Sequence, residues 1–539
     1  MSLSHAAITR RTFLGRSSVA IAGAAMCSPA RSWAVPVRSR SPVTSFAPPA
    51  MTPEQLRSMA TLALDAATRA GADFADIRVS ETRSYMPTPD YLMASRLYME
   101  YGYGIRVWAN GGTAFIGSAD PTPEGITRAA RSAVASAKDQ ATLSRARRAR
   151  PLIARPVARG EWTFPVEIDP FQLSPDDHIV VQNGFKLSGR QAGAVRNSFW
   201  SWSSETRVFA ASDGSLTTQQ ATWGRGFVQI TKAGWIPGYG LIWGEIDIPG
   251  FELKLMGVEA ILGEAVHDRL EAAADEIAPL INLPVYRLDD VGRRDLILDG
   301  PAFSKLVGQT VVPALRLSRA LGEEHDTEGP GFLGDPETVV GQQLFTPALN
   351  LQIEAAAPHY GARKWDDEGT ETQSVPLVEN GIVVRYLGTR GNVGALPLST
   401  HAALGVAFAP RVMTIPTERP GAVSVHTPSN GPSLAELTKQ MKDGLLVRGA
   451  SVQCDPRGGG GVLWSDMMFE VKQGQITRRL FGGRIEFSTK RVLHDPVLGD
   501  SGSVGAKDFY IAGGLPFDVS LTVCRAPAAL VHGVGLVRN

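Results

Sequence analysis

A dense group of potential metal ligands lies just past the middle of the sequence. Its members are Glu323, Glu324, His325, Asp326 and Glu328. Carboxylates beside an imidazole could hold a hard cation or serve as acid and base in a hydrolase. The same composition is typical of a solvated loop, which is the interpretation we favour. A relocated metal or catalytic group made of Glu323, His325 and Asp326 is the alternative.

Histidines and serines elsewhere do not form a recognisable catalytic set. His359 precedes Asp366, Asp367 and Glu368, and structural roles explain this group better than a second cation site. Serine catalysis needs a histidine that activates the nucleophile and an acid that orients the histidine. No histidine stands at a meaningful spacing from the candidate serines Ser318, Ser501 and Ser503. A Ser–His–Asp triad is therefore unsupported.

The overall composition excludes several classes of protein. The chain has 539 residues, of which 43% are hydrophobic and 20% charged, so it can bury a core and divide into roughly two to four domains. It has no long apolar span, which excludes a polytopic membrane protein. A net charge of +1 gives no electrostatic basis for binding nucleic acid. Three cysteines exclude a disulfide-dense scaffold and a zinc site made of four cysteines.

The first 34 residues are typical of an export signal. Residues 9–14 carry a twin-arginine pattern, residues 17–26 are uncharged and mildly apolar, and small residues flank the end of the segment at Ala34. We predict a Tat signal peptide over 1–34 and a linker over 35–51. Cleavage would remove four arginines and no acid, which takes the formal charge from +1 to −3. The mature protein would then be periplasmic or extracellular, and not membrane-bound.

Two side-chain types leave alternatives open in the mature chain. Four tryptophans could line a peptide groove, although we favour core packing. They are Trp200, Trp202, Trp223 and Trp464. After cleavage the remaining cysteines are Cys454 and Cys524, which could be free or form a disulfide in an oxidising compartment.

Apolar spacing predicts an α+β domain over residues 52–290. Thr52 is a suitable N-cap for its first helix. The expected helices cover 53–70, 122–138, 174–192 and 256–280. The expected strands cover 74–80, 101–108, 113–118, 198–210 and 216–230. Because turns join neighbouring strands, we expect an antiparallel sheet.

A β-rich domain is predicted over residues 291–539. It begins with a short strand over 295–299 and an amphipathic helix over 301–321. Short strands with glycine turns follow. A later helix begins after Ser433, which with Glu436 forms a capping box. The overall fold class is therefore α+β.

The order of several motifs resembles the TldD/PmbA (TldE) family, whose members are also described as modulators of DNA gyrase. In the first half, the similar segments are 72–79, 104–107 and 120–125. In the second half they are 365–370, 378–381, 410–414 and the helix at 433–444 followed by the glycine run 458–461. The resemblance covers essentially the whole mature chain, about residues 52–539.

This resemblance implies a subunit of a heterodimeric zinc metallopeptidase. The family's catalytic subunit carries a His-Glu-x-x-x-His helix and a later Cys, which leave a coordination position for water and provide a general base. Here Ala314 and Arg319 occupy the His positions, Leu315 the Glu position and Ala512 the Cys position. Ala and Leu offer no ligand atom, and Arg319 would repel Zn²⁺. We expect no catalytic residue, metal or other cofactor in this chain, and zinc only in a partner subunit.

The leading hypothesis is a non-catalytic, metal-free subunit. It would partner a homologous TldD-like zinc metallopeptidase subunit in proteolysis of unfolded peptides or a peptide precursor. One alternative is an active metallopeptidase or hydrolase that uses relocated residues. The other is a homodimeric peptide-binding or scaffold protein. A nucleic-acid partner is not expected, and an exported protein would not meet gyrase.

Overall fold

The computed structural model describes most of the chain after the predicted linker. The described residues are 51–87, 96–143, 152–184, 195–236, 240–247, 254–262, part of 266–288, 292–323, 331–355, 359, 361–396, 402–455, 457, 459–513 and 515–538. The predicted signal peptide and nearly all of the linker lie outside these residues. None of the described helices is both long and apolar enough to cross a membrane.

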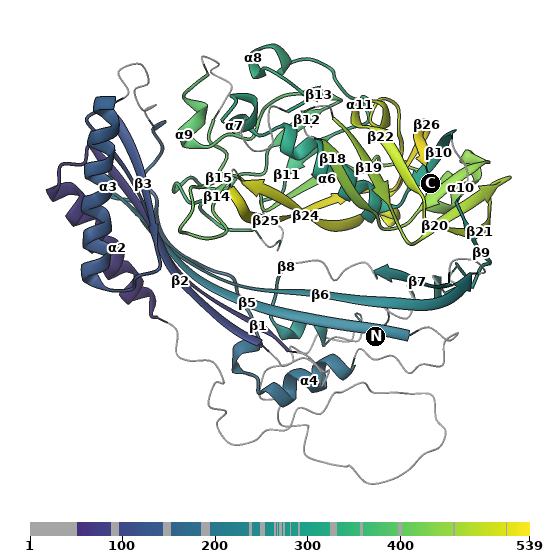
Figure 1. The fold of residues 1–539 in the computed structure, drawn as a ribbon, viewed down its shortest axis with the longest axis horizontal. Coiled ribbons are helices and arrows are strands. Elements are labelled where there is room, and N and C mark those ends of the chain that lie inside the picture. Colours follow the sequence, from purple (N-terminus) through teal and green to yellow (C-terminus); the bar gives the residue numbers. More distant parts are fainter. Residues whose placement is uncertain are drawn as a thin grey trace, which may run out of the picture.

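The first domain is built on a long, curved sheet with the order β3-β2-β1-β5-β6-β4, to which β7 and β8 add through β6. Its strands are β1 (Phe74–Met86), β2 (Arg96–Ala109), β3 (Gly112–Ser118), β4 (Arg159–Thr163), β5 (Val195–Ala211), β6 (Leu216–Ile236), β7 (Gly240–Asp247) and β8 (Lys254–Leu255). Most neighbours are antiparallel, as predicted, whereas β4 runs parallel to β6. Figure 1 shows the sheet sweeping from its helices to a position beneath the second domain.

Two long helices cover one face of this sheet. They are α2 (Pro53–Arg69) and α3 (Pro123–Leu143), and a shorter helix α4 (Pro175–Gly184) follows later. The predicted cap is confirmed, because Thr52 and Gln55 form a capping box at the start of α2. Side chains alternate between the faces of a strand, so Ala75, Ile77 and Val79 of β1 all pack against the helices. The intervening residues of β1 face the second domain.

Two sheets and a central helix form the second domain. The larger sheet has the order β18-β19-β22-β26-β10-β17-β20-β21-β9, with β23 beside β26. Its strands are β9 (Val285–Arg287), β10 (Gly292–Leu298), β17 (Gly444–Val447), β18 (Ser451–Asp455), β19 (Gly460–Trp464), β20 (Met468–Lys472), β21 (Gln475–Phe481), β22 (Arg484–Ser488), β23 (Val497–Leu498) and β26 (Ala529–Arg538).

The smaller sheet has the order β13-β12-β11-β16-β25-β24, and a separate pair joins β14 to β15. These strands are β11 (Leu351–Ile353), β12 (Pro376–Glu379), β13 (Ile382–Val383), β14 (Ala407–Phe408), β15 (Thr417–Glu418), β16 (Ala422–Val425), β24 (Gly505–Gly513) and β25 (Leu515–Ala526). The helices are α6 (Gly300–Ala314), α7 (Leu317–Ala320), α8 (Pro336–Val339), α9 (Arg390–Val393), α10 (Leu434–Met441) and α11 (Thr489–Val492). The α+β class and the β-rich second half are confirmed.

The predicted single helix over 301–321 is wrong in two respects. It is broken into α6 and α7, because Arg316 adopts an extended conformation and forms a β-bridge with Leu387. The Leu387 amide donates to the Leu315 carbonyl at 2.8 Å, so strand-like pairing replaces the next helical hydrogen bond. The prediction that this helix is amphipathic, with one exposed face, is also wrong. Most side chains of α6 are buried, because the helix packs against strands of both sheets.

Candidate functional site

The positions that the family resemblance aligns with the two zinc-binding histidines and the general base lie at the turn between α6 and α7, residues 314–319, which we call the α6–α7 turn. Ala314 ends α6, Leu315 caps it, and Arg319 lies in α7. All three are at most 2% exposed. A Cβ placed on Gly331 would lie 3.2 Å from the Ala314 backbone and 3.4 Å from Arg319 Cδ. The two former His positions therefore converge on one buried point.

A carboxylate of the second domain is already fully engaged at this turn. Glu418, on β15, accepts hydrogen bonds from the Ser318 amide at 2.8 Å and the Ser318 hydroxyl at 2.6 Å. The Asn392 side-chain amide also donates to Glu418, and Arg316 Nε lies 3.6 Å from it. Arg316 and Glu418 are both fully buried. Their contacts give Glu418 a structural role, since its oxygens are satisfied by protein donors.

The residues at the turn do not fit a zinc ion. Zn²⁺ takes Cys, His or carboxylate ligands, and among the described residues no three His, Cys, Asp or Glu side chains gather into a group that could hold a metal. Cys454 is the thiol near Arg319; burial raises its pKa to about 11, and it belongs to no group of three possible ligands among the described residues. Ala512 lies on β24, next to α6.

The structure separates the alternative site residues. Glu323 follows α7 and is exposed, whereas His325 and Asp326 lie outside the described residues. His359 is not part of a group with Asp366, Asp367 and Glu368. Burial is the main cause that lowers the pKa of His359 to about 4, and its charged neighbours are Arg525 and Glu354. The cysteines Cys454 and Cys524 are both free thiols.

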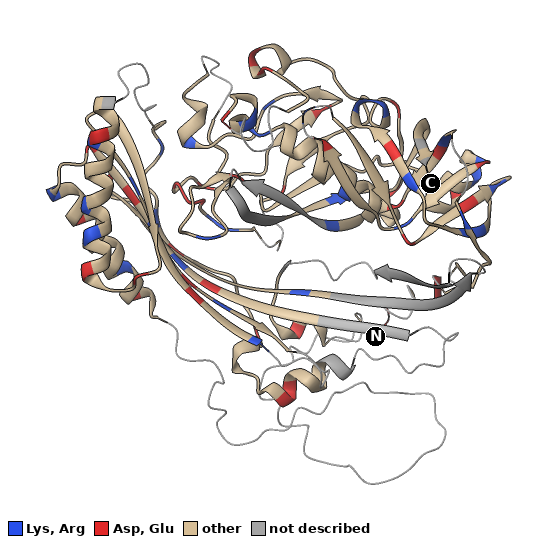
Figure 2. Ribbon diagram, viewed as in Figure 1, with Lys and Arg blue, Asp and Glu red and all other residues tan. Residues whose placement is uncertain are grey.

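A second buried region, rich in charge, lies where the long sheet meets the second domain. We call it the domain junction; it consists of residues 363–368 and 408–414 packed on the polar face of β1, β2 and β5. Asp76, Arg78 and Ser80 alternate with the apolar residues of β1, so they point to this face. Figure 2 shows charged residues on these strands as well as on the outer surface.

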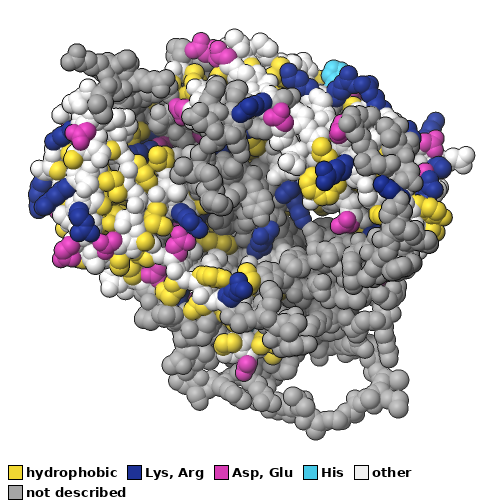
Figure 3. Space-filling view, in the orientation of Figure 1, with side chains coloured by type: hydrophobic (Ala, Val, Ile, Leu, Met, Phe, Trp, Pro, Cys, Tyr) yellow, Lys and Arg dark blue, Asp and Glu magenta, His cyan; other side chains and the backbone are white. Residues whose placement is uncertain are grey.

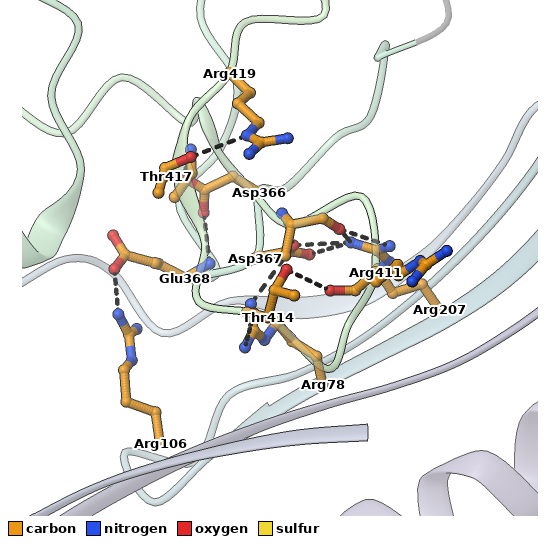
Figure 4. A network of polar contacts seen from close by, with 12 residues as sticks. Arg78, Arg106, Arg207, Asp366, Asp367, Glu368, Arg411, Thr414, Thr417 and Arg419 are labelled. Atoms are coloured by element: carbon orange, nitrogen blue, oxygen red, sulfur yellow. Dashed lines mark hydrogen bonds and ion pairs between the residues drawn. The ribbon is translucent and has the colours of Figure 1, made fainter. Parts of the chain in front are cut away.

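Ion pairs cross the domain junction. Arg207 of β5 donates from Nη1 to both oxygens of Asp367, at 2.7 and 2.8 Å. Arg207 also pairs with Glu205 at 2.7 Å, and Glu205 in turn pairs with Arg363 at 2.8 Å. Arg78 lies 3.7 Å from Asp367 and donates to the Thr414 carbonyl. Figure 4 shows Arg78 and Arg207 converging on Asp367.

A neighbouring pair extends this network along β2. Arg106 bonds Asp76 of β1 at 2.7 Å and Glu368 of the second domain at 2.6 Å (Figure 4). The side chain of Gln219, on β6, binds the backbone of the same segment. Its amide Nε2 donates to the Trp365 carbonyl at 2.8 Å, and its Oε1 accepts from the Lys364 amide at 2.9 Å. Segment 363–368 is therefore held by four strands of the first domain.

Adjacent acids at the domain junction have opposite pKa shifts. Burial would raise the pKa of Asp367, but the Arg207 and Arg78 guanidiniums hold it below its ordinary value. Burial and the nearby Glu368 raise the pKa of Asp366 to about 8, although three backbone amides donate to it. Their partners differ because Asp367 faces the arginines of the sheet and Asp366 folds back on its own loop.

Glycines allow the second domain to approach the sheet closely. A Cβ on Gly104 of β2 would lie 2.1 Å from the Val412 carbonyl oxygen, and one on Gly117 of β3 would lie 2.1 Å from the Met413 carbonyl oxygen. Any larger residue would push segment 408–414 away from the sheet. The glycines of this part of the chain therefore serve the domain contact.

Comparison with known proteins agrees with this architecture. A family profile described as the PmbA/TldA metallopeptidase C-terminal domain matches residues 291–514. A second profile, described as PmbA/TldA metallopeptidase domain 1, matches residues 98–137. The chain belongs to the PmbA/TldD family. No curated protein matches it significantly.

Solved structures show the same fold over nearly the whole of this PmbA/TldD-family chain. A candidate modulator of a DNA gyrase from Thermotoga maritima has a TM-score of 0.64 at 16% identity, covering 89% of this chain and 100% of its own. A similar protein from Bacteroides thetaiotaomicron has a TM-score of 0.61 at 16% identity, covering 90% and 99%. TldE from Thermococcus kodakarensis has a TM-score of 0.61 at 15% identity, covering 88% and 98%.

A cavity of about 190 Å³ opens at the domain junction. Hydroxyl groups of the sheet line one side, aromatic and apolar residues of the second domain line another, and charged residues border both. The lining residues are Ser80, Thr82, Ser84, Glu100, Gly102, Ser203, Glu205, Trp223, Arg363, Phe408, Pro410, Arg411 and Val412. Of the tryptophans considered above, Trp200 and Trp202 are core residues, whereas Trp223 reaches this cavity.

Sequence reasoning missed the cavity and most of the junction residues. The family segment 365–370 was recognised, but its role in binding the first domain was not. A usable signal exists in β1, where Asp76, Arg78 and Ser80 alternate with apolar residues. Such alternation predicts a polar face that needs a partner if it is buried. The carboxylate that pairs with Arg78, that of Asp367, lies almost 300 residues away.

Proposed function

We propose that this chain is a metal-free member of the PmbA/TldD family and the non-catalytic partner of a homologous zinc metallopeptidase subunit. The observation that carries the proposal is the α6–α7 turn. Ala314, Leu315 and Arg319 occupy the positions of two ligands and the general base, and all are buried. Glu418, a buried carboxylate bonded at this turn, is held by Arg316, Ser318 and Asn392.

The remaining parts of the proposal follow from the fold. β18 and β24 lie at edges of their sheets within the described part of the chain. Edge strands can bind an extended peptide by adding it to the sheet, so the chain would contribute a wall and a peptide-binding edge to a shared chamber. The substrate would be an unfolded peptide or a peptide precursor, hydrolysed at the partner's zinc.

We also propose that the protein works outside the cytoplasm, after export by the twin-arginine route. The twin-arginine segment and the uncharged stretch after it support this proposal. The described surface does not favour nucleic acid as a partner. On the face shown in Figure 3, basic and acidic side chains of the described residues are interspersed and are not gathered by sign.

Purification of the mature chain alone and together with a homologue that carries His-Glu-x-x-x-His tests this function. We expect the isolated chain to contain far less than one zinc per molecule by mass spectrometry and to leave unfolded peptides uncut. The co-purified pair should hold zinc and cleave them. A partner variant with the motif Glu changed to Gln should still assemble but lose activity.

Three results would argue against the proposal. Stoichiometric zinc and peptidase activity in the isolated chain would show that it is itself an enzyme. A stable homodimer that ignores every homologue in light scattering would favour a scaffold. Activity of the pair that survives loss of the partner's Glu would place the chemistry elsewhere.

A further inference from the structure

The cavity at the domain junction contains a buried cationic donor that no described protein group satisfies. Arg363 is 7% exposed and lines the cavity. It donates to Glu205 through Nη2 at 2.8 Å, and its guanidinium stacks on the Phe408 ring with Cζ 4.3 Å from the centroid. Its Nη1 is buried and has no hydrogen-bond acceptor among the described residues. A buried charged donor without an acceptor raises the free energy of the folded state, so we expect a ligand to bind this atom.

The ion pairs around this donor do not match it with a carboxylate of its own. Arg78, Arg207 and Arg363 share two carboxylates, those of Glu205 and Asp367. Burial would raise the pKa of each carboxylate, but the arginines hold both pKa values below their ordinary range, so both acids are ionised. Because Arg363 shares Glu205 with Arg207, its unsatisfied Nη1 can donate a charge-assisted hydrogen bond to an anionic ligand.

The other lining groups define the size and chemistry of that anion. A volume of about 190 Å³ somewhat exceeds that of a cavity of roughly 150 Å³ that holds benzene, so it accommodates a group the size of one amino acid. Ser80 and Thr82 present hydroxyls from β1, and Trp223 and Phe408 supply aromatic surface. The combination suits a carboxylate attached to a small, partly apolar body.

The geometry points to a binding site for the carboxylate of an amino-acid-sized group, such as the terminal residue of a peptide, held at Arg363 between the two domains. The hydroxyls of Ser80 and Thr82 border the ligand, and Phe408 keeps the guanidinium in place. Arg411 lies at the rim, where its side chain is 60% exposed and pairs loosely with Glu100 at 3.7 Å. The site stands apart from the α6–α7 turn, and its existence does not depend on a partner subunit.

Ligand-observed NMR on the full mature chain tests this site with N-acetylglycine, its neutral analogue N-acetylglycinamide, and inorganic phosphate. We expect saturable binding of N-acetylglycine and little binding of the other two. Arg363→Lys keeps the charge beside Glu205 but removes the second guanidinium nitrogen, so affinity should fall at least about tenfold. Thr82→Leu fills the cavity without altering any ion pair and should abolish binding. Arg128→Gln is a surface control outside the cavity lining, at a side chain that is 69% exposed and pairs with Asp120, and should change affinity by less than about twofold.

Each contrary result overturns the assignment. Equal binding of the acid and the amide would show that the charge is irrelevant, and binding of phosphate alone would indicate a different anion. No saturable binding by the folded wild type would mean that water satisfies Arg363. An equal loss in Arg128→Gln and Arg363→Lys would reduce the site to general surface attraction. Thermal melting of each variant verifies folding, and Thr82→Leu decides the matter if Arg363→Lys does not fold.

Discussion

The α6–α7 turn and the domain junction are both buried and both contain arginines, but they differ in what surrounds the charge. At the turn, Ala314 and Leu315 belong to a large hydrophobic core, and one carboxylate, Glu418, accepts from the Ser318 amide and hydroxyl. At the domain junction, Arg207 and Asp367 belong to a chain of ion pairs beside a cavity. Among the described residues, the side chains of the turn are buried in an apolar core, whereas the domain junction keeps space next to charge.

This difference reverses the expectation raised by the family resemblance. The family resemblance aligns the turn with the catalytic positions, yet among the described residues the turn offers no group of zinc ligands. A polar cavity with an unsatisfied donor lies instead between the domains. The ligand site that we propose there is separate from the turn.

Breaking the central ion pair should produce the largest effect. Asp367→Ala leaves Arg207 and Arg78 buried without their shared carboxylate, and removal of one partner of a buried pair costs about 3–5 kcal/mol. Urea unfolding followed by tryptophan fluorescence measures this loss. Asp65→Ala is the exposed control, since Asp65 makes a surface pair with Arg69 at 3.8 Å, and it should change stability by less than about 0.5 kcal/mol. A loss below about 1 kcal/mol for Asp367→Ala would mean that the domain contact does not depend on charge.

Restoring a ligand at the turn should also destabilise the fold. Ala314→His places an imidazole in a packed core, where overpacking and an unsatisfied polar group together cost about 2–4 kcal/mol. Ala435 is exposed on α10, so Ala435→His should cost about 0.5 kcal/mol or less. Melting temperatures with and without added zinc test this. Rescue of Ala314→His by zinc would show that the turn can still accept a metal.

Crowding the glycine contact should have a somewhat smaller effect. Gly104→Ala puts a methyl group 2.1 Å from the Val412 carbonyl oxygen, and the forced shift of segment 408–414 should cost about 1–3 kcal/mol. Gly502 is the matched control, because its nearest heavy atom to an added Cβ is 3.5 Å away. Limited proteolysis of the two variants, together with urea unfolding, measures the effect. Equal behaviour of both variants would show that the second domain does not rest tightly on β2.

Local signals predicted the parts of the fold that depend on neighbours in sequence. Thr52 as an N-cap marked the start of α2, and the capping box of Ser433 with Glu436 marked that of α10. The break after α6 escaped prediction, because it results from pairing with Leu387, some 70 residues later.

Residue types alone indicate that Ala314 and Arg319 offer no zinc ligand, and the absence of zinc from this chain stays a prediction. The cavity could not be predicted, because Arg363 and Thr82 come together only when the second domain packs on the sheet. The charges that position Arg363 are likewise brought together from distant strands, and their pairing is not visible as a motif.

Two adjacent acids provide the finest test of the comparison. The pKa of Asp366 is raised to about 8, so between pH 5 and 8 the folded protein holds a proton that the unfolded chain has released, and the contribution of this acid to stability falls as pH rises. His359, whose pKa burial lowers to about 4, contributes in the opposite direction below about pH 6.5, in the wild type and the variant alike. The pKa of Asp367 is lowered, so this acid is ionised in both states over the same range and adds no slope. Asp366→Asn should therefore make the slope of the unfolding free energy against pH more positive by about 1 kcal/mol per pH unit, whereas Asp65→Asn should leave the wild-type slope unchanged. Urea titrations at pH 5, 6, 7 and 8 measure these slopes. If the slope for Asp366→Asn equals that of the wild type, Asp366 is ionised like Asp367. The whole domain junction is then a network of fixed charges.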